Sequence, residues 1–500
     1  MAGGVAIFDY NHDGRPDIFF TNGADITTLE KNAPKYRNRL FRNDGNGKFS
    51  DVTEAAGLTG TGFDIGVSAG DYDNDGFPDL FVAGVHRSTL YHNNGNGTFT
   101  DVTAQAGLRS WSDGQSGPLW AVTAAWVDVN NDGLLDLFVV NYLQWHYDAK
   151  PLCSYKGTAD YCHPKYYKGL PNQLFLNKGN GTFQDVSAEW GIHDKIGKGM
   201  GVGVADYDGD GRPDLFVTND GYYNFLLHNT GSKFEEVAFP AGVALPEVGD
   251  FVSGMGLDFR DVNNDGLPDI AFVALNNQTF PLFLNTGQGD FREVTSLSGL
   301  HQITMPMAGF GAGLYDFDND GWKDLFVTRG HVASLSGEGQ VINQNNTVFH
   351  NEGANGKWRA LTEEARLNAV PPARHRGCAF GDLDGDGRVD VVATALGETA
   401  ELWLNRSSQK GHWLEIALQG TKSNRDGLGT RIKLQSKSGL QYNQMTTSVG
   451  YASSSLGPVH FGLGNDYHVD LVEIRWPSGA IQTLHDLEAD RLLTVKEQPR

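Results

Sequence analysis

Short apolar segments alternate with polar turns along almost the whole chain. Runs such as DLFVAG at 79–84 and DLFVTN at 214–219 are rich in Val, Leu and Phe, and each is followed by a second aromatic run ending in Asn, such as LYHN at 90–93. An Asn/Gly turn and a short final segment come next, as in NNGNGTFTDVT from Asn93. Short runs of this composition bounded by Gly and Asn predict β-strands, and the Asn-Gly turns predict hairpins. With the small-residue apolar segment that precedes each unit, the pattern predicts four strands per unit.

One nonapeptide of the form D-x-[DN]-x-D-G-x-x-D recurs between the first and second strands of these units. Seven copies occur, spaced 62, 57, 78, 55, 55 and 66 residues apart. We number them loops 1 to 7, and they begin at Asp9, Asp71, Asp128, Asp206, Asp261, Asp316 and Asp382. This period, with four strands per copy, is typical of a propeller blade repeated around an axis. The sequence therefore predicts an all-β fold, a seven-bladed β-propeller.

Each loop places three or four carboxylates within nine residues, where they repel one another unless a cation neutralises them. The side chains at positions 1, 3, 5 and 9 can converge on one point if the chain turns sharply at position 6, where every copy has Gly. With a carbonyl oxygen from position 7 they form an all-oxygen cage that suits calcium better than magnesium. We therefore expect up to seven Ca²⁺ ions.

The expected ligands share these positions in every copy, with position 7 contributing only its carbonyl oxygen. They are Asp9, Asn11, Asp13, Arg15 and Asp17 in loop 1; Asp71, Asp73, Asp75, Phe77 and Asp79 in loop 2; Asp128, Asn130, Asp132, Leu134 and Asp136 in loop 3; Asp206, Asp208, Asp210, Arg212 and Asp214 in loop 4; Asp261, Asn263, Asp265, Leu267 and Asp269 in loop 5; Asp316, Asp318, Asp320, Trp322 and Asp324 in loop 6; and Asp382, Asp384, Asp386, Arg388 and Asp390 in loop 7.

Two other interpretations of the loops are weaker. An EF-hand needs a bidentate Glu at position 12, where these copies have Phe, Val or Ala, and the flanking segments have strand rather than helix periodicity. Asp and Gly also form ordinary turns, but seven copies in one register favour a structural metal that pins two strands of a blade. Because ligand charge tunes affinity, loops 1, 3 and 5, with Asn at position 3, should bind calcium more weakly than the four-carboxylate loops.

The acidic loops and Asn-Gly hairpins resemble those of the FG-GAP/VCBS repeat propellers, a family that includes the integrin α head and several extracellular lectins. The resemblance covers residues 1–408. The seventh repeat stops at LWLN, residues 402–405, and lacks the last hairpin strand. We expect that strand to come from ahead of the first repeat, which would mean that this sequence begins late; a three-stranded seventh blade is the alternative.

The pattern changes after the seventh repeat, where the acidic loops stop. Segments such as WLEIAL at 413–418 and DLVEIRW at 470–476 alternate as strands, and residues 409–500 predict a small β-sandwich. HWLEIALQG, GYASSSLGPVHFGLG and VEIRWPSG resemble the ASPIC/UnbV domain, which follows such propellers in the cartilage acidic protein 1-like family. The match departs at residues 427–430 and at Ala452. The resemblance implies an extracellular binding or matrix-associated protein.

Charge narrows the range of partners. The 500-residue chain has a formal net charge of −22. This charge argues against a nucleic-acid or anionic-membrane partner, because binding to phosphate groups requires clustered Lys and Arg side chains. The seven nonapeptides hold 25 of the 61 acidic side chains and four basic ones, so the other 437 residues are almost neutral at −1. No apolar run is long enough to span a membrane. The acidity therefore indicates bound metal more than a basic partner.

An insertion separates loops 3 and 4. Residues 142–171 are rich in aromatic side chains and include Cys153 and Cys162, which we expect to form a disulfide in an exported, oxidised protein. An aromatic insertion on a propeller loop is a candidate recognition surface. We expect an extracellular, periplasmic or cell-surface location, although the sequence contains no signal peptide.

The sequence contains no G-x-S-x-G, H-E-x-x-H or Walker-type motif. We therefore expect a non-enzymatic, monomeric, calcium-stabilised protein that binds a glycan or an extracellular protein through propeller loops. Two alternatives stay open. One is an enzyme that acts on a polysaccharide or a small molecule at the propeller axis, and the other is a purely structural surface or matrix component.

Overall fold

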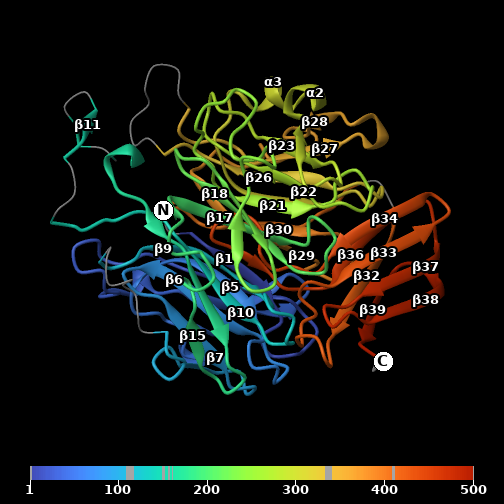
Figure 1. The fold of residues 1–500 in the computed structure, drawn as a ribbon, viewed down its shortest axis with the longest axis horizontal. Coiled ribbons are helices and arrows are strands. Elements are labelled where there is room, and N and C mark those ends of the chain that lie inside the picture. The colour runs from blue at the N-terminus through green and yellow to red at the C-terminus, as the bar shows by residue number, and fades with distance from the viewer. Residues whose placement is uncertain are drawn as a thin grey trace.

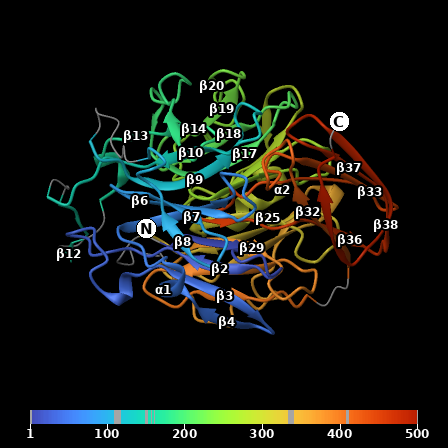
Figure 2. The same cartoon turned by 90° about the horizontal axis from the view of Figure 1, so that it is seen from below.

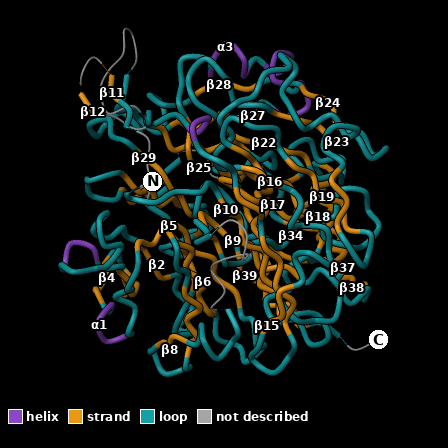
Figure 3. The backbone as a smooth tube through the Cα atoms, turned by 60° about the vertical axis from the view of Figure 1, so that its left-hand side comes forward, coloured by secondary structure: helices purple, strands orange, loops and turns teal. Residues whose placement is uncertain are grey.

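A computed structural model describes residues 3–108, 117–148, 152–155, 158–159, 162–332, 341–407 and 411–498. Strands dominate the described chain, and the few helices are short and peripheral (Figure 3). The α-helices are α1 (Thr53–Ala56), α2 (Thr295–Ser298) and α3 (Leu300–Thr304), and the 3-10 turns are Pro34–Tyr36, Pro164–Tyr166 and Gly353–Asn355. None of the described helices has the length and apolar character of a membrane span. The predicted all-β class is confirmed.

Each acidic loop joins the first and second strands of its own antiparallel sheet, which we call blades 1 to 7. Blades 1 to 4 contain β1 (Val5–Phe8), β2 (Asp17–Phe20), β3 (Arg39–Gly45) and β4 (Lys48–Asp51); β5 (Phe63–Gly70), β6 (Asp79–Val85), β7 (Thr89–Asn93) and β8 (Phe99–Asp101); β9 (Ala121–Val127), β10 (Asp136–Asn141), β14 (Gln173–Asn177) and β15 (Phe183–Asp185); and β17 (Gly199–Ala205), β18 (Asp214–Asn219), β19 (Phe225–Asn229) and β20 (Phe234–Glu236). Blades 5 to 7 contain β21 (Leu257–Arg260), β22 (Asp269–Phe272), β23 (Leu282–Asn285) and β24 (Phe291–Glu293); β25 (Gly309–Tyr315), β26 (Asp324–Arg329), β27 (Thr347–Asn351) and β28 (Trp358–Ala360); and β29 (His375–Gly381), β30 (Asp390–Ala395) and β31 (Glu401–Trp403).

Seven of the described sheets, blades 1 to 7, form a ring (Figure 1). Their first strands, β1, β5, β9, β17, β21, β25 and β29, contact one another in chain order, and β29 also contacts β1. Apolar side chains of adjacent blades form shared cores, such as the cluster that joins Phe138 and Val140 of β10 to Val202 and Val217 of blade 4. These contacts between successive sheets are those of a β-propeller, the architecture that the repeats predict.

The two ends of the ring are closed in different ways. Blade 7 has three strands among the described residues, which is the alternative that we considered. Blade 1, in contrast, gains a fifth strand, because β35 (Ser454–Ser455) pairs in parallel with β1. The strand that joins the ring from outside the repeats therefore comes from the C-terminal part of the chain.

Residues 411–498, which we call the C-terminal module, form two facing sheets (Figure 1, orange to red). One sheet contains β36 (Val459–Gly464), β32 (His412–Gln419) and β39 (Arg491–Lys496), and the other contains β34 (Gly439–Gln444), β33 (Arg431–Ser436), β37 (His468–Arg475) and β38 (Ile481–Glu488). Leu414 and Phe461 of the first sheet pack with Ile432 and Val472 of the second. The same cluster includes Trp126 of β9, so the module and the ring share one core.

One stretch of the module, residues 444–456, lies inside the ring, and we call it the axial segment. Tyr451 is fully buried, and its ring contacts Phe310 of β25 at a centroid distance of 5.5 Å. The backbone of Gly450 donates a hydrogen bond to Leu257 of β21 (2.9 Å), and Val67 of β5 donates one to the carbonyl of Ala452 (3.1 Å). The axial segment therefore extends along the ring axis as far as the beginnings of the first strands, which lie away from the acidic loops.

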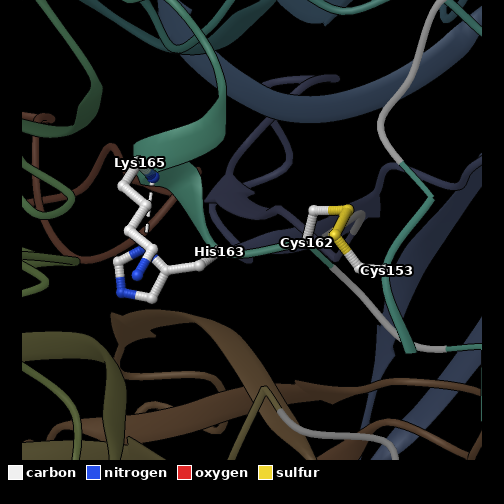
Figure 4. Close-up of a disulfide and its surroundings, with 4 residues drawn as sticks. All are labelled: Cys153, Cys162, His163 and Lys165. Carbon is white, nitrogen blue, oxygen red and sulfur yellow. Dashed lines mark hydrogen bonds between the residues drawn. A yellow bond between two sulfur atoms is a disulfide. The ribbon is translucent and has the colours of Figure 1, made fainter. Parts of the chain in front are cut away.

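The insertion lies on the other side of the ring from the module in both views (Figures 1 and 2). It includes β11 (Ser154–Tyr155) and β12 (Thr158–Ala159), and β13 (Leu170–Pro171) pairs with β16 (Ile196–Gly197). Cys153 and Cys162 are joined by a disulfide, beside which the backbone N–H of Lys165 donates a hydrogen bond to Nδ1 of His163 (Figure 4). Part of the predicted recognition surface, residues 149–151, 156–157 and 160–161, is outside the described residues.

Candidate metal centres in the acidic loops

The turn of every loop has the same backbone geometry. The Gly at position 6 has a φ between 78° and 99°, and its N–H donates to a carboxylate oxygen of the position 1 Asp at 2.7–3.1 Å. Position 4 also has a positive φ in all seven loops, and is Asn, Gly or His. Such residues adopt left-handed backbone at the lowest cost. The recurrence of Asn, Gly or His at position 4 and of Gly at position 6 is therefore explained by the positive φ that the turn requires at both positions.

The carboxylates at positions 5 and 9 are held by backbone N–H groups. The position 7 N–H donates to the position 5 Asp at 2.8–3.1 Å in each loop. Position 9 is at most 2% exposed, and its two oxygens accept from the N–H of position 2 and from that of the Asn that ends the third strand. Each loop therefore presents pre-oriented carboxylates.

The Asn that ends the third strand also ties each blade to the preceding one. Its side-chain amide donates to the carbonyl of position 2 in the preceding loop, at 2.6–2.9 Å, in all seven blades. Asn43 of blade 1 donates to Leu383 of loop 7, which closes the series. The acidic loops are thus linked into one hydrogen-bonded ring.

Burial of these carboxyl groups disfavours their charged form. It raises the pKa of Asp17 and Asp390 to about 7 and that of Asp214 to about 8. Burial, and then the neighbouring Asp426 carboxyl, raise the pKa of Asp71 to about 8. Oxygen atoms of Asp71, Asp73 and Asp79 lie within 4.8 Å of one another. A divalent cation would relieve this unfavourable charge, so the donor set fits an oxygen-liganded ion such as calcium.

Position 3 distinguishes two kinds of loop. In loops 1, 3 and 5 the Asn amide donates to the position 5 carboxylate, as Asn130 does to Asp132 at 2.9 Å. In the other loops position 3 is a second carboxylate. In loop 7, Arg406 pairs with Asp384 and also with Asp386 at 2.9 Å. The extra negative charge therefore has a cationic neighbour in that loop.

In loops 2, 4 and 6 a histidine faces the position 3 carboxylate. These are His92, His228 and His350, each directly before the strand-ending Asn. Contact with Asp79 raises the pKa of His92 to about 9, and contact with Asp324 does the same for His350. The sequence analysis did not identify these histidines as site residues. The signal available was the histidine directly before the Asn in runs such as LYHN at 90–93.

The C-terminal module contacts several of the loops. Arg431 pairs with Asp206 of loop 4 at 2.9 Å, and Asp426 accepts a hydrogen bond from the backbone N–H of Asp71 at 2.8 Å. In loop 6, Lys323 donates to the carbonyl of Tyr442 at 2.8 Å. These contacts use positions 1 and 8 of the nonapeptide, so the loops are an internal docking surface as well as candidate metal centres.

Known families match both parts of the chain. The FG-GAP-like repeat family matches residues 9–82, 71–139, 166–217, 206–272, 261–327 and 332–393, and the ASPIC and UnbV family matches residues 420–500.

Cartilage acidic protein 1 of Homo sapiens is 24% identical over 501 residues, covering 95% of this chain and 69% of that protein. The Xenopus tropicalis protein of the same name is 25% identical over 378 residues, covering 72% of this chain and 52% of its own length. Among solved structures, a lectin of Agrocybe aegerita that recognises non-reducing terminal N-acetylglucosamine is 16% identical with a TM-score of 0.43, covering 72% of this chain and 80% of the lectin. The family matches span more than half of the chain, which therefore belongs to the FG-GAP repeat proteins and ends in an ASPIC and UnbV domain.

Proposed function

We propose that this protein is an exported recognition protein, stabilised by calcium in its acidic loops, that binds a glycan or an extracellular protein. The observation that carries the proposal is that the module docks on the acidic loops, through contacts such as Arg431 to Asp206. A loop that also serves as an internal docking surface suits a structural metal. In this proposal the two folding parts divide at residues 408 and 409, and the protein acts as a monomer.

Recognition then belongs to the opposite side of the ring, which we call the insertion face. It is formed by the connections between second and third strands and by those between blades. An aromatic patch lies there, composed of Tyr222, Tyr223, Phe239 and Phe251. Tyr222 stacks on Phe251 with the rings 19° from parallel, and Phe239 and Phe251 are more than half exposed. Exposed aromatic rings with polar tips are favoured at recognition sites, because they supply contact area at low entropic cost.

The axial segment disfavours the enzyme alternative. Its Tyr451 is fully buried against β25, where a substrate bound at the axis would need space. Ligand sites are concave and partly apolar, whereas the chain itself occupies this part of the axis. The purely structural alternative remains an outcome of the following test.

A binding screen tests the proposal. The wild-type protein is applied to arrays of glycans and extracellular matrix proteins, beside the Tyr222→Ser/Phe251→Ser double variant and a variant in which residues 147–162 are replaced by a Gly-Ser linker. We expect one or both changes to weaken binding about tenfold or more, since a few central aromatic residues dominate most interfaces. Tyr467→Ser is the matched control, because this tyrosine is 74% exposed on the module.

Chelation separates the two roles proposed for the loops. If calcium only stabilises the fold, binding persists in EDTA at temperatures where the protein stays folded. Loss of binding without unfolding would instead mean that calcium bridges the ligand. No binding by the wild-type protein to any glycan or matrix protein would contradict the recognition role and favour a structural component.

A further inference from the structure

The position before the strand-ending Asn differs systematically among the seven blades. It is histidine in blades 2, 4 and 6, leucine in blades 3, 5 and 7, and arginine in blade 1. In chain order these residues are Arg42, His92, Leu176, His228, Leu284, His350 and Leu404. Strand pairing places the position at the same point beside each loop, because the following Asn donates its N–H to the position 9 carboxylate. The seven blades therefore place histidine, leucine or arginine at the same position beside otherwise similar loops.

In all three histidine-bearing blades Nδ1 faces the carboxylates of positions 3 and 9. Nδ1 of His92 is 3.3 Å from Asp73 Oδ2 and 3.2 Å from Asp79 Oδ1. The corresponding distances from His228 are 3.5 Å to Asp208 and 3.2 Å to Asp214. Those from His350 are 3.8 Å to Asp318 and 3.0 Å to Asp324. The same nitrogen is therefore presented to the same two ligand positions three times.

Two further observations point to an ion at this place. Nδ1 of His92 and of His228 is buried, and its contacts with the two carboxylates, at 3.2–3.5 Å, lack the geometry of a hydrogen bond. A nitrogen and two carboxylate oxygens lie within 4.8 Å of one another in each of the three loops, for example on His92, Asp73 and Asp75. Buried polar atoms are normally paired, so an unsatisfied nitrogen beside carboxylates suggests a missing partner.

The residue at position 3 of a loop correlates with the presence of a histidine in the same blade. The three loops with a histidine all have Asp at position 3, and the three loops with Asn there have arginine or leucine in its place. Loop 7 has Asp384 and Leu404, but Arg406 pairs with its carboxylates. A fourth carboxylate and an imidazole nitrogen therefore occur together, as they would if both served one ion.

We propose that loops 2, 4 and 6 bind a divalent transition-metal ion of the Zn²⁺ type, with His92, His228 and His350 as nitrogen ligands, while the other four loops take only oxygen-liganded calcium. Calcium is bound by oxygen atoms, whereas imidazole nitrogen combined with carboxylates suits zinc, cobalt and related ions. The inference rests on the proposed function only in that the acidic loops hold metal.

The rival explanation is that each histidine orients the position 9 carboxylate from outside the coordination shell, as the hydrogen bond of His350 Nδ1 to Asp324 at 3.0 Å allows. Such outer partners typically change metal affinity by about 10- to 100-fold. A loss of affinity alone therefore does not distinguish the two explanations. Selectivity between ions does, because an orienting residue supports calcium and zinc alike.

The test uses the whole protein, freed of metal and titrated separately with Ca²⁺, Zn²⁺ and Co²⁺. The variant His92→Leu/His228→Leu/His350→Leu carries the side chain that blades 3, 5 and 7 have at the same position. We expect the wild type to bind three Co²⁺ ions with the visible absorption of nitrogen-ligated cobalt. In the variant this absorption is lost and zinc affinity at these sites falls at least about tenfold, while calcium affinity changes less than about twofold.

A gain-of-site variant keeps the inference testable if the triple variant folds poorly. Asn130→Asp/Leu176→His gives loop 3 the side chains of the other class, and we expect a fourth cobalt site with the same absorption. An unchanged cobalt spectrum in the triple variant, or an equal loss of calcium and zinc affinity, would overturn the inference. Failure of calcium to bind while three cobalt ions do would contradict the calcium part of the proposed function and leave this inference standing.

Discussion

The two faces of the ring are built from different parts of the same repeat. The loop face carries seven nearly identical acidic turns linked by Asn side chains, such as Asn43 donating to Leu383. The insertion face carries connections that differ in length and sequence, from the short turn at 86–88 to the insertion at 142–171. The module docks on the repeated face, and the variable face carries exposed aromatic side chains such as Phe239.

The two faces differ because their residues are under different structural constraints. On the loop face every blade must meet the same neighbour in the same way, so positions 1 to 9 vary little and residues such as Gly76 occupy backbone that few other residues adopt. Connections on the insertion face make contacts that differ from blade to blade, such as that of His86 with the carbonyl of Trp145, and can vary as recognition requires. The loop face should therefore govern stability and the insertion face binding.

Deleting residues 411–500 should have the largest effect. The inner strands and the acidic loops would lose the axial segment, including the strand β35 that pairs with β1. We expect little soluble protein and no cooperative thermal transition. Replacing residues 147–162 on the insertion face should shift Tm by only about 2 °C, because exposed loops tolerate such changes. If the protein lacking residues 411–500 unfolds at the wild-type Tm, the loop face does not govern stability and the prediction is wrong.

Tyr451→Ala should have the next largest effect. Its side chain is fully buried in the ring axis, and removing a large aromatic group from such a site costs about 3–5 kcal/mol. Tyr467→Ala, at 74% exposure on the module, should change the free energy of unfolding by less than about 0.5 kcal/mol. Chemical denaturation measures both. Equal effects of the two substitutions would show that the axial segment adds no stability.

The metal-free protein should lose stability as the pH rises. Burial raises the pKa of Asp17, Asp79 and Asp390 to about 7, so the folded chain holds protons that the unfolded chain releases near pH 4. This contribution is fully present below about pH 4 and is lost as the pH rises through 7. We expect Tm in a chelator to fall by about 5 °C between pH 5 and pH 8.

Calcium should abolish most of that fall, because the ion replaces the protons. Thermal scans over the same pH range with and without calcium measure this. A metal-free Tm that rises toward pH 8 would contradict the assignment of the buried carboxyls as the source of the pH dependence.

The smallest expected effect compares single loops. Asp384→Asn should weaken calcium binding in loop 7 by about threefold to tenfold, and Asn130→Asp should strengthen it in loop 3 by a similar factor, since charge count tunes affinity. Isothermal titration on each variant checks this. Equal affinities in three- and four-carboxylate loops would mean that position 3 does not contribute a ligand charge.

Much of the loop face was readable from the sequence. Every nonapeptide has Gly at position 6, as at Gly14, and the N–H of that Gly donates a hydrogen bond to the position 1 Asp in every loop. Such contacts span five residues or fewer, so a local pattern suffices to predict them. The strand-ending Asn is visible as a sequence motif, but its donation to the neighbouring blade is not, because that partner lies 78 to 340 residues away along the chain. Similarly, His92 faces Asp73 only once strand pairing brings β7 beside its loop.

By itself, the sequence determined the all-β class, the repeat and the acidic turns, because each depends on alternation or on backbone angles within a few residues. The tertiary structure alone decided that the module docks on the acidic loops and that its axial segment fills the ring. Val5 donates to Ser453 across 448 residues of chain. Contacts of that kind depend on burying two complementary surfaces together, and no local periodicity encodes them.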